Sequence, residues 1–189
     1  MNGVLITFDY ELFLGSRSGT VARCMLTPTR EILKILSDNN AKAVFFVDSY
    51  YLHRLKIVAA EHERAAADYE QIRQQVITMA NQGHYVFYHI HPHWLDAVYG
   101  SQQNQWSLPT TRKFCFSNLD ETERTSVFDD AANALNQILA QAVHYQQPNG
   151  FRAGGLYVQP FMLFKEHFIK HNILFDFSVL LGAEGRGNF

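Results

Sequence analysis

The stretch GHYVFYHIHPHW, residues 83–94, decides the fold because it joins a helix end, a strand and a cluster of histidines. Gly83 is a typical C-terminal stop for the helical pattern that precedes it. Residues 85–90 form an aromatic and β-branched run, which predicts a buried strand. Pro92 is favoured at the first position of a helix. The stretch therefore predicts a helix, a strand and a second helix in succession.

The same alternation continues on both sides of this stretch. Strands that alternate with helices predict an α/β fold with a parallel sheet, either a barrel or a doubly wound sheet, in one domain of residues 1–189. Residues 95–118 have little periodicity, and a connection of this length is often a functional loop. The predicted strands are 4–9, 41–47, 85–90, 150–152 and 173–177. One predicted helix has Thr27 as its N-cap, a second runs most clearly over 68–82, a third begins at an Asp120/Glu123 capping box, and a fourth covers 160–171.

Polar side chains stand where the predicted strands end. In parallel α/β folds, reactive groups gather at the carboxyl ends of the strands. We therefore expect these side chains to converge on one site. They are Asp9 and Glu11 after the first strand, His89, His91 and His93 after the third, Arg152 at the fourth and Asp176 at the fifth.

The three histidines allow two ways of sharing one ion. In an extended chain, His89 and His91 project to the same face, which is the geometry of many metal sites on β-structure. Alternatively, His89 at the strand end and His93 in the first turn of a helix that begins at Pro92 close on the same ion. One helix through both is disfavoured, because Pro92 disfavours helical geometry at His91. The spacing alone leaves both pairings open.

The acids beside this cluster complete a plausible hydrolytic centre. Zinc sites of hydrolases commonly combine two histidines, one carboxylate and water. On a strand, Asp9 and Glu11 point the same way, so one can bind the ion while the other takes a proton. Arg152 is expected to hold the base ionised through a bidentate pair.

Composition excludes several other classes of protein. The chain has 189 residues, 47% of them hydrophobic, and a formal net charge of −2, so it has no basic footprint for nucleic acid and no polybasic membrane patch. The N-terminal residues lack a signal-peptide pattern, and no segment has the ~18 apolar residues of a membrane span. Two cysteines make no disulfide framework. A cytoplasmic protein is expected, and its oligomeric state is not predicted.

Four motifs, in order, resemble those of the NodB-type polysaccharide deacetylases, carbohydrate esterase family four. The family patterns are T-F-D-D-G, A-T-F-F-V, G-H-E-I-x-x-H-[ST]-x-x-H and F-R-x-P. The DYELFLG, HIHPHW and FRAGG segments resemble one branch of this family. The matching segments are TFDYE (7–11), AVFFV (43–47), GHYV (83–86) with His89 and His93, and FRA (151–153).

The resemblance implies a distorted (β/α)7 barrel, C-terminally incomplete in a chain of this length, and a divalent metal, zinc in most members. It implies that Asp9 is the general base, positioned by Arg152. His89 and His93 would bind the metal, with Glu11 as the carboxylate ligand because Tyr10 replaces the usual acid. The backbone N–H near Gly155 would stabilise the oxyanion. That leaves His91 to contact a ligand of the metal or the substrate. The aromatic ring of Trp94 is expected to stack on a sugar.

The implied function is removal of acetyl groups from an N- or O-acetylated sugar or polysaccharide by metal-activated water. Besides Tyr10, the chain departs from the family pattern at Gly154, which replaces the proline, and in having no Leu-x-His segment to supply the usual general acid. Two alternatives therefore stay open: a related amide hydrolase that acts on a small non-sugar substrate, and a non-catalytic glycan-binding relative.

Overall fold

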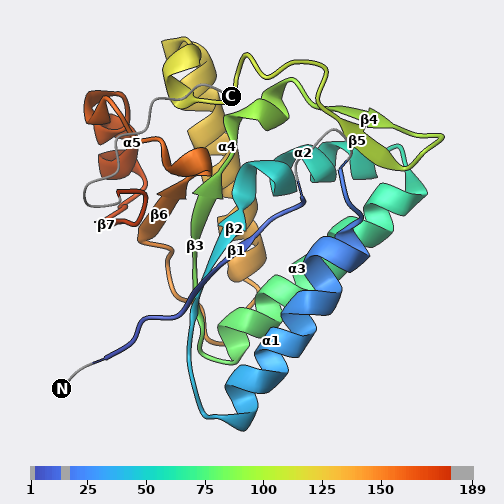
Figure 1. The fold of residues 1–189 in the computed structure, drawn as a ribbon, viewed down its shortest axis with the longest axis vertical. Helices are drawn as coiled ribbons and strands as arrows, with labels where there is room; N and C mark the ends of the chain where they lie inside the picture. The colour runs from blue at the N-terminus through green and yellow to red at the C-terminus, as the bar shows by residue number, and fades with distance from the viewer. Residues whose placement is uncertain (1–2, 14–17, 180–189) are drawn as a thin grey trace.

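A parallel five-stranded sheet forms the centre of the protein. The structure, a computed structural model, describes residues 3–13 and 18–179. The strand order is β1-β2-β3-β6-β7, and every neighbouring pair is parallel (Figure 1). The strands are Thr7–Tyr10 (β1), Val44–Asp48 (β2), Tyr85–Ile90 (β3), Gly150–Ala153 (β6) and Phe175–Asp176 (β7), with Val98–Gly100 (β4) and Gln105–Ser107 (β5) in a separate antiparallel hairpin.

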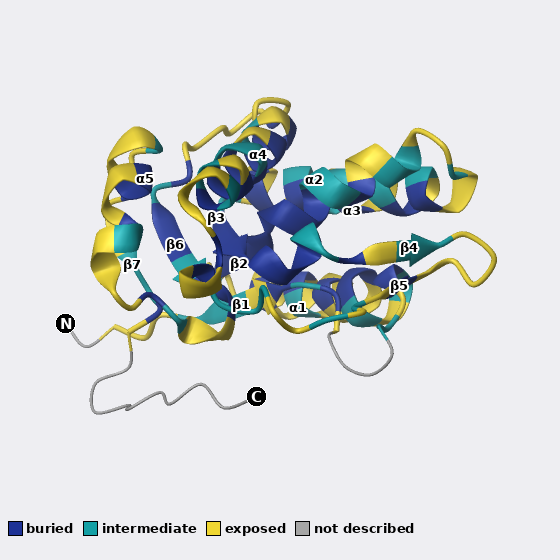
Figure 2. Cartoon of the chain, turned by 90° about the horizontal axis from the view of Figure 1, so that it is seen from above, coloured by how far each residue is buried: buried dark blue, intermediate teal, exposed yellow. Residues whose placement is uncertain are grey.

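Helices cover one face of the sheet. From this face Tyr10 donates a hydrogen bond to Gln75 of α3 (Glu63–Asn81), and Tyr88 donates one to Asn136 of α4 (Glu121–Leu139). The hairpin β4–β5 and helix α5 lie at opposite ends of the molecule (Figure 2). The helices are Thr27–Asp38 (α1), Ser49–Ala59 (α2), Glu63–Asn81 (α3), Glu121–Leu139 (α4) and Lys165–Lys170 (α5), with short helical turns at Ala22–Leu26 (η1), Pro92–Leu95 (η2), Phe116–Asn118 (η3), Gly154–Leu156 (η4) and Phe161–Leu163 (η5).

The opposite face of the sheet, which we call the site face, carries the polar residues. Register aligns Asp9 with Phe46 and Phe46 with Phe87, and it also aligns Asp48 with His89 and His89 with Arg152. Because partners in neighbouring strands point the same way and side chains two apart share a face, both rows lie on this one face. Phe46 and Phe87 pack together below the polar row, with ring centroids 5.9 Å apart.

Most of the predicted elements are confirmed. The strand over 85–90 has the predicted bounds, and Gly83 ends α3 with a φ of 79°, a backbone conformation that favours glycine. Asp120 and Glu123 form the predicted capping box at the start of α4. A short helical turn begins at Pro92, as predicted. The alternation of strands and helices, and the parallel sheet that follows from it, are therefore correct.

Four local predictions are wrong. Thr27 is not an N-cap, because the turn η1 leads directly into α1. The first strand begins at Thr7, and the residues before it are largely exposed. The stretch 95–118 contains the β4–β5 hairpin. The predicted helix 160–171 is divided into η5 and the short α5, with Phe164 between them.

The closed barrel stays a prediction. Over the described residues, β1 and β7 are the two edges of the sheet, and no pairing between them is recorded. Among these residues, no helix combines the length and the apolar character that a membrane crossing needs.

Candidate functional site

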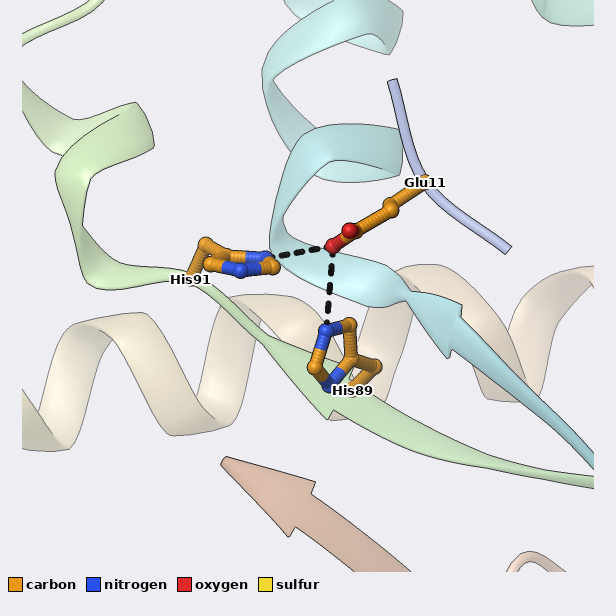
Figure 3. A group of neighbouring side chains, drawn as sticks. All are labelled: Glu11, His89 and His91. Atoms are coloured by element: carbon orange, nitrogen blue, oxygen red, sulfur yellow. Dashed lines mark hydrogen bonds and ion pairs between the residues drawn. The ribbon is translucent and has the colours of Figure 1, made fainter. Parts of the chain in front are cut away.

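Glu11, His89 and His91 meet at the carboxyl end of the sheet (Figure 3). Glu11 follows β1, His89 lies near the end of β3, and His91 comes directly after β3. The Glu11 Oε2 atom lies 3.1 Å from His89 Nε2 and 3.4 Å from His91 Nδ1. One ligand atom from each residue lies within 4.8 Å of the other two, which is the spacing of a metal-ligand set. Both histidines are buried and Glu11 is half-buried.

The hydrogen bonds of His89 fix which ring nitrogen carries its proton. His89 Nδ1 lies 2.7 Å from the backbone carbonyl of Arg152, and a carbonyl only accepts, so Nδ1–H is the donor. In neutral His89 the Nε2 lone pair therefore faces the Glu11 carboxylate, which is also an acceptor. This arrangement is favourable only if a proton or a metal ion lies between the two atoms. A histidine that donates its second N–H to a carbonyl is the usual form of a metal ligand.

His91 lies between two carboxylates. Its Nδ1 atom is 3.1 Å from Asp48 Oδ2 and 3.4 Å from Glu11 Oε2. The ring passes so close to Gly154 that a Cβ built at that glycine would lie 2.3 Å from His91 Cδ2. The ring therefore occupies space that any other residue at position 154 would fill.

Asp48 is the site residue that the sequence analysis missed. It is fully buried at the end of β2, and its Oδ2 accepts a 2.6 Å hydrogen bond from Trp94 Nε1. Its Oδ1 accepts one from the backbone N–H of Tyr51, which caps α2. The available signal was an acid directly after the apolar run 43–47, at the same strand end as the histidines.

The charges in this group support one another. Burial acts to raise the pKa of the Asp48 carboxyl, but the neighbouring histidines, His91 first, hold it below its usual range. Burial acts to lower the pKa of His89, but the hydrogen bond to Glu11 and the charges of Asp48, Glu11 and Asp9 raise it above its ordinary value. Three nearby carboxylates therefore favour positive charge at His89, whether a proton or a metal ion supplies it.

Asp9 and Arg152 form a pair beside the metal-ligand set. Arg152 Nη1 donates to Asp9 Oδ1 over 2.6 Å, while Nη2 donates to Thr7 Oγ1 over 3.1 Å. The expected bidentate pair is therefore replaced by one bond to the acid and one to the threonine. The guanidinium carbon also lies 4.0 Å from the centroid of the Phe46 ring, a cation–π contact. The Asp9 side chain is 36% exposed, so substrate can reach it.

His93 is near the group but is not part of its hydrogen-bond network. Its ring centroid lies 4.9 Å from that of His91 and 5.9 Å from that of Phe114. Both ring nitrogens are buried without a hydrogen-bond partner among the described residues. Burial, and then the charge of His91, lower the His93 pKa to about 3, so the ring is neutral. The structure therefore brings His91 to Glu11, whereas the sequence predicted His93 at this position.

Three other residues of the predicted site have the following surroundings in the structure. Trp94 is fully buried and its Nε1 donates to Asp48, so it holds a neighbour of the site in place, while its contact with substrate stays a prediction. Gly155 is exposed in η4 and has a φ of 65°. Asp176 accepts a hydrogen bond from the backbone N–H of Ser178, so it stabilises a turn after β7.

The geometry fits a divalent cation. Two imidazoles and one carboxylate are the donor set of many zinc sites, and the opposed acceptor atoms of His89 and Glu11 require a positive charge between them. Asp9 offers an accessible carboxylate on the same face, in contact with a fixed guanidinium. The site can therefore hold an ion and move a proton next to it.

No family model matches the chain, and no curated protein sequence matches it. One solved structure, described as "putative polysaccharide deacetylase from Mycobacterium smegmatis", is 16% identical, with a TM-score of 0.49 over 91% of this chain. The match covers 49% of that protein, so this chain spans about half of its length.

Proposed function

We propose that this chain is a metal-dependent hydrolase that removes acetyl groups from an N- or O-acetylated sugar or polysaccharide. The observation that carries the proposal is the position of Asp9, paired with Arg152, on the same face as Glu11, His89 and His91. The order of the four motifs, which resembles that of the polysaccharide deacetylases, supports the substrate class.

Glu11, His89 and His91 would hold the ion, with Zn²⁺ favoured by the two imidazole donors. When bound, a divalent ion polarises an acetyl carbonyl and lowers the pKa of a water molecule to ~7. The Arg152 carbonyl accepts from His89 Nδ1, which leaves Nε2 to face Glu11 and the ion. His91 Nδ1 lies 3.1 Å from Asp48 Oδ2 and 3.4 Å from Glu11 Oε2, so an ion bound at this atom would replace the hydrogen bond to Asp48.

Asp9 would act as the general base. Its Oδ1 atom accepts a hydrogen bond from Arg152, while Oδ2 has no hydrogen-bond partner among the described residues and is available for the proton of the attacking water. The backbone N–H of Gly155 is the proposed donor to the oxyanion, a role that backbone amides commonly have. This N–H lies in a turn directly after β6, next to the strand end that carries Arg152.

The test is acetate release from acetylated glycans by the zinc-loaded protein. We expect activity that a chelator removes and zinc restores, and an Asp9→Asn variant that retains zinc but is slower by ~10²–10⁴-fold. Amine or ammonia release from small amides, without acetate release from glycans, would favour the small-amide hydrolase. Glycan binding without any product would favour the non-catalytic relative. Asp9→Asn rates equal to those of the unmodified protein would refute the assignment of the base.

A further inference from the structure

A second pocket, of about 200 Å³, lies between the β4–β5 hairpin, the first turns of α3 and Tyr51 of α2. A water molecule takes ~30 Å³ in the liquid, so this volume exceeds that of one structural water several times. It is smaller than the ~300–1,000 Å³ of pockets for drug-sized ligands. The pocket therefore fits one small molecule. We call it the hairpin pocket.

Tyr51 lines the hairpin pocket, and its buried hydroxyl has no hydrogen-bond acceptor among the described residues. The side chain is fully buried, and its Oη has no hydrogen-bond partner among the described residues. The indole of Trp106 is near, but an indole N–H only donates and cannot accept the tyrosine proton. Burial and the charge of Asp68 raise the pKa of Tyr51 well above its ordinary value, so the hydroxyl keeps its proton. A buried unpaired donor is costly, and a ligand acceptor would satisfy it.

Asp68 and Arg64 add a charged pair to the wall of the same pocket. Asp68 Oδ1 lies 3.1 Å from Arg64 Nη2, but the two atoms are not aligned as a hydrogen bond, and Oδ1 is buried without such a partner. The Arg64 side chain is 50% exposed, so the pocket opens to solvent on this side. The pair is neutral as a whole, and it offers both donors and an acceptor. It therefore favours an uncharged ligand that both donates and accepts.

Aromatic rings and amides complete the lining. Tyr99 and Trp106 are packed edge to face, with centroids 5.3 Å apart, and both line the pocket. The amide side chains of Gln103 and Gln105 lie at the exposed rim. Aromatic rings bind the C–H face of a sugar ring, while the polar groups bind its hydroxyls.

We propose that the hairpin pocket binds a single uncharged, polyhydroxylated ring of monosaccharide size. Each hydroxyl of such a ring can accept from Tyr51 or Arg64 and donate to Asp68. This binding goes beyond the proposed hydrolysis and does not require it.

The hairpin pocket is distinct from the candidate metal centre. Trp94 lies between them: its ring centroid is 4.7 Å from that of Tyr51, and its Nε1 is bonded to Asp48. Trp94 and Trp106 are the only two tryptophans of the chain, and their centroids are 5.4 Å apart. Intrinsic fluorescence therefore reports on the wall of the pocket.

The experiment is a fluorescence titration of the whole chain with glucose and with N-acetylglucosamine. We expect a saturable change that is weakened about fivefold in Tyr51→Phe, because one hydrogen bond is lost. This variant should keep its Tm, since the Tyr51 hydroxyl has no hydrogen-bond partner among the described residues. The matched control is Tyr88→Phe, which removes a buried hydroxyl that is bonded to Asn136. It should lower the Tm and leave sugar binding unchanged.

Three results would overturn the proposal. They are no saturable change in the unmodified protein, equal affinity in Tyr51→Phe, and loss of binding in Glu11→Gln, which would move the sugar to the metal centre. Conversely, binding that persists in Glu11→Gln and weakens in Asp68→Asn supports the hairpin pocket even if acetate release fails. The two proposals are therefore tested separately.

Discussion

The ring of His91 packs so closely against Gly154 that any side chain at position 154 would overlap it. A Cβ at position 154 would lie 2.3 Å from His91 Cδ2 and 2.9 Å from Nε2. The φ of Gly154 does not lie in the left-handed region, so the glycine is required for space and not for backbone conformation. The glycine at position 154 therefore leaves the space that the His91 ring occupies where it approaches Glu11.

We expect Gly154→Ala to displace His91 and weaken metal binding. The overlap forces the ring or the backbone to move, at a cost of ~1–3 kcal/mol for overpacking. Because disturbing the orientation of a ligand typically costs ~10–100-fold in affinity, zinc binding measured by calorimetry should fall by that factor.

The matched control is Gly3→Ala, since a Cβ there meets nothing within 4 Å. This variant should keep both its Tm and its zinc affinity. Unchanged zinc affinity in Gly154→Ala would mean that His91 does not bind the ion.

Single substitutions can show whether His91 or His93 is the third ligand of the ion. His91→Ala should abolish stoichiometric zinc on a dialysed sample, as His89→Ala should. His93→Phe should retain zinc and keep or raise the Tm, because it removes two buried nitrogens that have no partner among the described residues. Metal analysis and thermal unfolding measure both effects. Zinc lost in His93→Phe and kept in His91→Ala would restore the pairing of His89 with His93.

Trp94 should stabilise the protein through its bond to Asp48 as well as through its packing. Trp94→Phe removes the 2.6 Å donor to a fully buried carboxylate and should cost ~1–3 kcal/mol in the free energy of unfolding, besides the packing loss. In a double-mutant cycle with Asp48→Asn, measured by chemical denaturation, the two effects should not add. Strictly additive effects would mean that the contact contributes no coupling energy.

The ion pairs that Asp129 forms with Lys170 and His171 predict a pH-dependent contribution to stability. Burial acts to raise the pKa of Asp129, but the hydrogen bonds from Lys170 and His171 outweigh it and hold the pKa below its usual range. For a lowered carboxyl pKa, the stabilisation is complete above the unfolded-state value of ~3.9 and is lost as the pH falls through the folded-state value.

Asp129→Asn should therefore lower the Tm at pH 7, by the equivalent of ~1 kcal/mol or less for a partly exposed pair, and have no effect in strong acid. Thermal unfolding over a pH series measures this difference. Asp38→Asn, at the exposed pair of Asp38 with Lys34, is the control and should change little. A constant difference at all pH values would contradict the ion-pair origin.

The parallel sheet was predictable because each central strand is a short apolar run between clear stop signals. Residues 85–90 follow Gly83 and precede Pro92, so local sequence alone sets both ends. The hairpin β4–β5 was missed because its strands are three residues each, too short for a period to appear. Its one buried strand residue, Trp106, is surrounded by polar neighbours.

The candidate site was predictable in its location and less so in its membership. Strand ends place Asp9, Glu11, His89 and Arg152 on one edge because parallel strands end together. The choice between His91 and His93 depends on side-chain directions after Pro92, which spacing does not encode. Asp48 was missed because an acid between a strand and a helix also has an ordinary capping role, and it does cap α2 here.

Arg152 contributes to the site twice, and this links the site to the order of folding. Its side chain is bonded to Asp9, 143 positions earlier in the chain, and its carbonyl is bonded to His89. Closing so long a loop is slow compared with local pairing. A nascent chain that has completed β3 already contains Glu11, His89 and His91, yet His89 has no acceptor for Nδ1 until β6 docks. We therefore expect a competent metal site to appear only after β6 joins the sheet, at the same step that gives Asp9 its arginine.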